Sequence, residues 1–172
     1  MEIFIECGDI TRLHVDVVVN AASPLLLGGG GVDGAIHAAA GPGLLKECQD
    51  LDGCPVGRVR LTGGHDLPAR HIIHAVGPRW RGDGLDDMGL LASCYRQALK
   101  MADGLGAKSI AFPAISTGIY GYPLEVACPV AAREVLAFQS VAKSLEMVIL
   151  VAYDRRTQLA LADALYPATT PG

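Results

Sequence analysis

Two glycine-rich stretches constrain the fold of this chain most strongly. Each follows a short β-branched apolar run and precedes a helix-like segment; the first covers residues 20–37, with four consecutive glycines at 28–31, and the second covers residues 112–123. Glycine lets backbone N–H groups converge on an anion, and the following helix terminus adds a partial positive charge. Neither stretch contains Lys or Arg. The pattern predicts two uncharged cradles for a ligand with more than one phosphate, unlike phosphoryl-transfer sites, which use a lysine and a metal.

Length and composition indicate one folded domain. The chain has 172 residues, of which 51% are hydrophobic and 19% charged, which is too apolar for a disordered protein. We assign the domain to residues 1–166 and expect a frayed tail at 167–172. The net charge of −4 disfavours sequence-independent binding to nucleic acid or to an anionic membrane, because both need clustered basic residues.

Cysteine usage and the beginning of the sequence favour a cytoplasmic location. The number of cysteines is odd, five, and none forms a C-x-x-C pair, so a disulfide framework is not expected. The N-terminal segment has no basic region followed by an apolar stretch, as a signal peptide would. No apolar run reaches the ~18 to 20 residues of a membrane span.

Apolar periodicity alternates between short strands and longer helices. We predict strands at residues 3–7, 15–20, 58–62, 71–76, 109–113 and 146–153, and helices at 33–40, 44–50, 86–105, 124–140 and 157–166. The glycines and proline at 41–43 are expected to stop the first helix. This alternation predicts an α/β protein, a three-layer α/β/α sandwich around a mixed sheet in which the apolar strand 15–20 is central. Ligands of such sheets bind beyond the carboxyl ends of strands, here after residues 7, 20 and 113.

The segment 29–34 also matches the dinucleotide fingerprint G-x-G-x-x-G, which is weak evidence when it stands alone. The fingerprint starts at a strand end, whereas eight residues separate Asn20 from Gly29. The acidic residue expected ~20 positions later would fall near residues 50–52, in a Gly/Pro-rich region rather than at a strand end. A nucleotide-cofactor oxidoreductase is therefore a disfavoured alternative.

Several longer stretches resemble the macro domain family, in particular its MacroD-type ADP-ribosyl hydrolases. They are GDIT at 8–11, NAA at 20–22, GGGGVDGAIH at 28–37, IHAVGP at 73–78 and FPAISTGIYGYP at 112–123. The likeness extends from about residue 1 to residue 160. It implies ADP-ribose as ligand and hydrolysis of ester-linked groups at the distal ribose, acting on mono-ADP-ribosylated Asp/Glu side chains of proteins and on O-acetyl-ADP-ribose. No cofactor is implied, and no metal-ligand pattern is recognisable.

The resemblance assigns the adenine end to Asp9 and Ile10. In the family this Asp accepts a hydrogen bond from the adenine amino group and the next residue touches the base. By composition alone, Asp9 is a turn or N-cap residue. Asn20, at the end of a strand, either ties down the following loop or contacts the ligand, and both interpretations stay open. Ser23 stands where the family has the Asn that reaches the distal ribose. The shorter side chain predicts weaker ribose orientation and slower turnover, or else a bridging water that fills the gap.

The first glycine-rich loop would hold the diphosphate and the catalytic acid. The resemblance places the N–H groups of Gly30, Gly31 and Val32 on the diphosphate. Asp33 resembles the active-site aspartate, although a first-turn acid can merely complement the helix dipole. Repulsion from the diphosphate would make this carboxylate a better proton acceptor for an attacking water. His37 lies one turn later on the same helix face, so we predict a supporting catalytic role.

The second glycine-rich loop would complete the cradle. The resemblance assigns the diphosphate to the backbone of its central residues and the distal ribose to Tyr120. A nucleophile elbow around Ser116 is disfavoured because residue 114 is Ala where that motif requires Gly. The residues assigned to ADP-ribose in this loop are Ser116, Thr117, Gly118, Ile119 and Tyr120.

The site residues predict ADP-ribose binding more strongly than catalysis, because the short side chain of Ser23 affects how the ribose is oriented. A non-catalytic reader of ADP-ribosylated proteins is therefore the main alternative, and Asp33 argues against it. A cradle without cations predicts that ADP-ribose affinity hardly depends on salt concentration.

Overall fold

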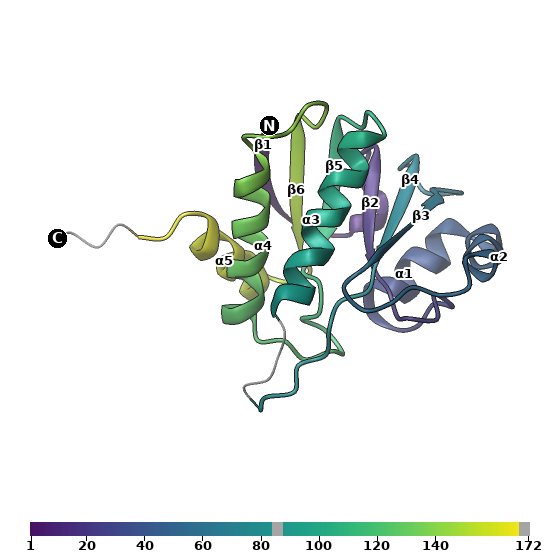
Figure 1. The fold of residues 1–172 in the computed structure, drawn as a ribbon, viewed down its shortest axis with the longest axis horizontal. Helices are drawn as coiled ribbons and strands as arrows, with labels where there is room; N and C mark the ends of the chain where they lie inside the picture. The colour runs from purple at the N-terminus through teal and green to yellow at the C-terminus, as the bar shows by residue number, and fades with distance from the viewer. Residues whose placement is uncertain (84–87, 169–172) are drawn as a thin grey trace.

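The computed structural model, which describes residues 1–83 and 88–168, is an α/β sandwich with helices on both faces of one sheet (Figure 1). The six strands are β1 (Glu2–Cys7), β2 (Val17–Ala21), β3 (Val59–Gly63), β4 (His71–Ala75), β5 (Ser109–Pro113) and β6 (Met147–Ala152). The helices are the short 3₁₀ turn η1 (Ile10–Arg12), α1 (Gly31–Ala40), α2 (Pro42–Leu51), α3 (Met88–Gly104), α4 (Leu124–Phe138) and α5 (Arg155–Leu165). The predicted fold class is confirmed.

The strands pair in the order β1-β6-β5-β2-β4-β3, and every pair is parallel except β3 with β4. Strand β2 lies between β5 and β4, where both of its faces are covered by helices. This position explains its apolar sequence, because a strand buried on both faces does not alternate between apolar and polar residues.

Two apolar cores lie on opposite faces of the sheet. Val17 and Val19 of β2 belong to the core beneath α3, α4 and α5, whereas Val18 belongs to the core beneath α1 and α2. The same alternation places Ile110 and Ala111 of β5 in different cores. Successive side chains of a strand point to opposite faces, so both cores form from the same strands. In the described part of the chain, no helix is long and apolar enough to cross a membrane.

Most predicted boundaries lie within two residues of the observed ones, and the larger differences have local causes. Helix α1 begins at Gly31, two residues before the predicted start. The segment 41–43 separates α1 and α2 at Gly41 alone, because Pro42 starts α2, where its missing N–H has no partner to lose. The predicted loop after β1 contains the 3₁₀ turn η1. The predicted start of α3 at residue 86 and most of the predicted tail, 169–172, lie outside the described residues.

Candidate functional site

A cavity of about 1170 Å³ lies at the carboxyl ends of β1, β2, β5 and β6. Its walls contain both glycine-rich loops, which are more than seventy residues apart in the sequence. All the predicted site residues except Asn20 and His37 line this cavity, namely Asp9, Ile10, Ser23, Gly30, Gly31, Val32, Asp33, Ser116, Thr117, Gly118, Ile119 and Tyr120. The sequence-predicted strand exits therefore meet at one place.

The first loop leaves three backbone N–H groups available at the cavity wall. Gly30 is the N-cap of α1 and has no side chain to cap it, so among the described residues no protein acceptor takes the N–H groups of residues 31–33. The next N–H, that of Gly34, returns to the carbonyl of Gly30 at 3.3 Å. A Cβ on Gly34 would collide with the carbonyl oxygen of Gly29, so the loop requires glycine at this position. An uncapped helix start of this kind attracts anions.

The second loop is held in place by its own hydrogen bonds. Thr117 donates through Oγ1 to the Ala114 carbonyl at 2.7 Å, and the Tyr122 N–H donates to the Ser116 carbonyl at 2.9 Å. Ser116 has a φ of +69°, a backbone conformation that is uncommon for residues other than glycine. These contacts leave the N–H groups of residues 118–120 without an acceptor in the part of the chain that the structure describes.

The two loops approach each other closely across the cavity. A Cβ on Gly30 would lie 3.3 Å from Cδ1 of Ile119, so the glycine of the first loop and the side chain of the second are in close contact. The two sets of free N–H groups thus border one space. This arrangement suits an extended anion such as a diphosphate.

Asp33 places a buried carboxylate in the same wall. Its residue is 6% exposed, and its Oδ1 accepts a hydrogen bond of 2.8 Å from Nδ2 of Asn20, which is fully buried at the end of β2. Its Oδ2 lies on the side of Gly29, since a Cβ there would be 3.3 Å from this atom. Asn20 does not line the cavity. Of the two roles considered for Asn20, the structure favours the one in which its side chain holds the following segment, through the hydrogen bond to the Asp33 carboxylate.

His37 lies on the other side of the first loop, where it lines a smaller cavity of about 450 Å³. Its Nε2 is 3.5 Å from Oδ1 of Asp33, in an orientation that makes no hydrogen bond, and this buried nitrogen has no other partner among the described residues. Its ring packs beside Gly28. The structure therefore brings His37 close to the carboxylate but not to the main cavity, and its catalytic role stays a prediction.

Asp9 performs the capping role that its sequence context allows. Its Oδ1 accepts hydrogen bonds from the backbone N–H and the hydroxyl of Thr11, at 2.9 and 2.6 Å, and so caps η1. These hydrogen bonds lower the pKa of Asp9, so the side chain stays an ionised acceptor. Its residue is exposed and lines the cavity, which leaves Oδ2 available. Ile10 is buried beside it.

Buried polar atoms without partners mark the surroundings of the cavity. Among the described residues, Oγ of Ser116 and Oδ1 of Asn20 are both buried and make no hydrogen bond. Buried polar atoms are nearly always paired in folded proteins. Ser116 lines the cavity, but its hydroxyl is buried on the side of Gly77, where a Cβ on that glycine would collide with it.

The expectation of a site without cations is wrong. Arg79, which follows β4, and Arg156, in the first turn of α5, both line the cavity. The guanidinium carbon of Arg79 lies 4.5 Å from the ring centroid of Tyr120, and Trp80 N–H donates to the Tyr120 carbonyl at 2.7 Å. Neither arginine is part of a glycine-rich stretch. Their positions just after β4 and β6 were the signal that could have identified them, because parallel strands end at the same edge.

The described residues contain no group of three or more His, Cys, Asp or Glu side chains that could hold a metal ion. The cavity wall brings together backbone N–H groups, the buried carboxylate of Asp33, the exposed carboxylate of Asp9 and the exposed side chains of Arg79 and Arg156. Such a site can bind a phosphorylated ligand and place an acid or base beside it.

Comparison with known proteins identifies the family. A family model described as Macro domain matches residues 19–131. A macro domain-containing protein of Methanosarcina mazei is 51% identical over 158 residues, 92% of this chain and 84% of the relative. A Klebsiella pneumoniae protein named O-acetyl-ADP-ribose deacetylase is 52% identical, over 87% of this chain and 88% of the relative. A mutant of the Oceanobacillus iheyensis macrodomain, solved with ADPR, superimposes with a TM-score of 0.89 at 43% identity, covering 94% of this chain and 90% of that one.

The match spans both glycine-rich loops and the strands that place them around one cavity. The fold, the loop sequences and relatives of about half identity thus agree. This chain belongs to the macro domain family.

Proposed function

We propose that this protein binds ADP-ribose in the large cavity and hydrolyses ester-linked groups on its distal ribose. One observation carries the proposal: two facing loops offer six backbone N–H groups that have no acceptor among the described residues, those of residues 31–33 and 118–120, beside the buried carboxylate of Asp33. Converging backbone N–H groups match the diphosphate of ADP-ribose, and Arg79 and Arg156 line the same cavity. The carboxylate supplies a general base next to them.

The names of related proteins support this choice of ligand and reaction. The Oceanobacillus iheyensis relative was solved with ADPR, and the Klebsiella pneumoniae relative is named a deacetylase of O-acetyl-ADP-ribose. In the proposed complex, the adenine lies at Asp9 and Ile10 and the diphosphate lies between the two loops. The distal ribose then lies near Ser23, Asp33 and Tyr120. The substrates are mono-ADP-ribosylated Asp or Glu side chains and O-acetyl-ADP-ribose.

The proposed reaction adds one water molecule across an ester bond. Asp33, assisted by a substrate phosphate oxygen, orients the water and takes its proton as the oxygen attacks. The bond between the acyl group and the ribose oxygen breaks. The ribose oxygen takes up a proton, the acyl group leaves as a carboxylate, and the products are ADP-ribose and acetate or an unmodified side chain.

Calorimetry with ADP-ribose and a turnover assay on mono-ADP-ribosylated glutamate and O-acetyl-ADP-ribose test the proposal. Asp33→Ala is expected to keep ADP-ribose binding and to lower kcat by about 100-fold or more, since removing a general base has effects of this size. Asp163→Ala, an exposed acid of α5 away from the cavity, is the matched control and should leave both unchanged. Unchanged turnover in Asp33→Ala would contradict the catalytic assignment.

A non-catalytic reader of ADP-ribosylated proteins is the second candidate, and Ser23 favours it. Ser23 lines the cavity but has only a short hydroxyl side chain with which to orient the ribose. Tight ADP-ribose binding without turnover in the wild type would establish the reader in place of the hydrolase.

A further inference from the structure

A row of buried polar side chains crosses the sheet on the face covered by α1 and α2. Asn20 of β2 and His74 of β4 are register partners in the parallel pair, and both are fully buried. Thr62 of the neighbouring strand β3 is 2% exposed, and its Oγ1 lies 2.9 Å from Nε2 of His74. The row begins at Asp33 of α1, in the cavity wall, continues over β2 and β4, and ends at Thr62 of β3.

The partners in this row fix the direction of every hydrogen bond. A carboxylate only accepts, so the Asn20 atom that lies 2.8 Å from Asp33 Oδ1 is its amide nitrogen. The same Nδ2 lies 3.1 Å from Nδ1 of His74, which must therefore accept. The imidazole proton is then on Nε2 and is donated to the Thr62 hydroxyl. Burial supports this neutral form, because it lowers the pKa of His74 to about 4.

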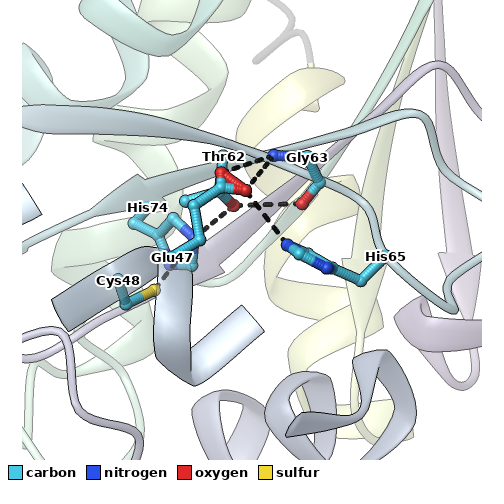
Figure 2. Close-up of polar contacts among 6 residues, drawn as sticks. All are labelled: Glu47, Cys48, Thr62, Gly63, His65 and His74. Carbon is cyan, nitrogen blue, oxygen red and sulfur yellow. Dashed lines mark hydrogen bonds and ion pairs between the residues drawn. The ribbon is translucent and has the colours of Figure 1, made fainter. Parts of the chain in front are cut away.

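The far end of the row is anchored to the backbone. The Thr62 hydroxyl donates to the Gly63 carbonyl at 3.1 Å, and the Gly63 N–H donates to Glu47 of α2 at 3.1 Å. Figure 2 shows His74 beside Thr62 and the Cys48 sulfur, with Glu47 directed at Gly63 and His65. The acceptor for His74 is thus held in place by a strand end and a helix.

We propose that His74, with its tautomer selected by Thr62, is a positioning residue that sets the amide of Asn20 and thereby the carboxylate of Asp33. The inference deepens the proposed function, because it assigns a role to the support of the proposed general base. With both N–H bonds of Asn20 used, the amide cannot rotate without losing two hydrogen bonds. A rotated amide would direct its oxygen at the Asp33 carboxylate, where two acceptors repel. Asp33 Oδ1 stays engaged in this arrangement, and Oδ2 is left for chemistry.

A purely structural role for Thr62 makes the opposite prediction from this proposal for two matched variants. Thr62→Val keeps the shape of the side chain and removes the hydroxyl, whereas Thr62→Ser keeps the hydroxyl and removes a methyl group. If Thr62 only fills space, Thr62→Val should leave kcat unchanged and Thr62→Ser should lower it. If Thr62 selects the tautomer of His74, Thr62→Ser should leave kcat unchanged. In Thr62→Val, by contrast, the imidazole proton can move to Nδ1. There it faces the N–H group of Asn20, and two donors repel each other.

The kinetic arm compares kcat, KM and the Kd for ADP-ribose in the two variants. Thr62→Val is expected to lower kcat by about tenfold with an unchanged Kd, because small misplacements of a catalytic group have effects of this order. Thr62→Ser should retain most of the wild-type kcat. Equal kcat in both variants, or a loss in Thr62→Ser alone, would overturn the proposal.

Two substitutions of His74 separate its two nitrogens in the same assay. The amide oxygen of Asn in His74→Asn stands near the position of Nδ1 and can still accept from Asn20. The longer His74→Gln reaches toward Nε2 and Thr62 but offers Asn20 no acceptor. We expect kcat to fall further in His74→Gln than in His74→Asn. The reverse order would contradict the proposed role of Nδ1.

An NMR arm keeps this inference separate from the proposed hydrolase activity. The nitrogen shifts of the His74 ring report its tautomer, and the side-chain amide of Asn20 reports its hydrogen bonds. We expect a neutral ring with hydrogen on Nε2 in the wild type and a changed Asn20 amide signal in Thr62→Val only. If the wild type turns over no substrate, the proposed function fails and these signals alone decide the inference. An unchanged Asn20 signal in Thr62→Val would then refute it.

Discussion

The two faces of the central sheet differ in what they bury. Beneath α3, α4 and α5, β2 and β4 bury the apolar residues Val17, Val19, Ile73 and Ala75, and the half-buried His71 begins β4 on the same face. Beneath α1 and α2, the same two strands carry the polar pair Asn20 and His74 next to Val18 and Ile72. A buried polar group is tolerated only where partners satisfy it, which makes the second face costlier to build. The polar row that leads to the Asp33 carboxylate therefore lies on the face beneath α1 and α2.

The apolar face should respond to mutation in stability and not in activity. Leu99 of α3 is fully buried in that core. Leu99→Ala is expected to lower the free energy of unfolding by about 2–5 kcal/mol, because it removes buried methyl groups and leaves a cavity. Denaturant unfolding measures this loss, and kcat of the folded fraction should stay at the wild-type value. A several-fold loss of kcat in the folded fraction would contradict this prediction, because it would show that the core beneath α3, α4 and α5 also affects catalysis.

The polar face should make stability depend on pH in a defined window. Burial lowers the pKa of His74 from 6.5 to about 4, so between these values the unfolded chain binds a proton that the folded protein does not. Stability is therefore fully present above pH 6.5 and falls as the pH decreases toward 4. The total loss is on the order of 3 kcal/mol, since one pKa unit corresponds to about 1.4 kcal/mol.

His74→Asn is the control for this pH dependence. The titratable groups that face His74, namely Asp33 and His37 of α1 and Cys48 of α2, remain in the variant. The difference in slope between the two proteins thus isolates His74. Unfolding free energies measured between pH 7 and pH 4 should decline less steeply in the variant. Parallel curves would show that His74 titrates in the folded protein as it does in the unfolded chain.

The sequence predicts the strands, helices and glycine-rich loops better than it predicts the contacts between residues that are distant in the sequence. The apolar run before Asn20 identifies β2 as central, and the glycines at 28–31 identify the cradle, because both signals are local. The Asn20–His74 pair depends on the register of two strands whose paired residues are 54 positions apart in the sequence. The sequence places His74 on an apolar strand but gives no sign of its partners, because these lie on the neighbouring strands. Arg79 was missed for a similar reason, since only the fold brings the end of β4 to the glycine-rich loops.

Ser23 provides a smaller test of the catalytic side. It lines the cavity close to the start of the first loop, where an Asn would extend an amide farther toward the distal ribose. Ser23→Asn is expected to raise kcat by a few-fold, about 1 kcal/mol of transition-state stabilisation, through better ribose orientation. Ser23→Ala, measured in parallel, should lower it slightly or not at all. A slower Ser23→Asn enzyme would mean that the serine suits this ligand better than an amide.

Salt should have the smallest effect, although not the zero effect that the glycine-rich loops alone predict. Arg79 and Arg156 are exposed at the cavity wall, so added salt screens their attraction for a bound diphosphate. We expect the Kd for ADP-ribose to rise about two- to threefold between low and physiological ionic strength. Arg79→Gln should weaken that dependence and leave the affinity in physiological salt nearly unchanged. The backbone N–H groups of the two loops carry no net charge, so binding by them alone depends little on salt. A steep loss of affinity with added salt would therefore show that the two arginines, and not the loops, bind the diphosphate.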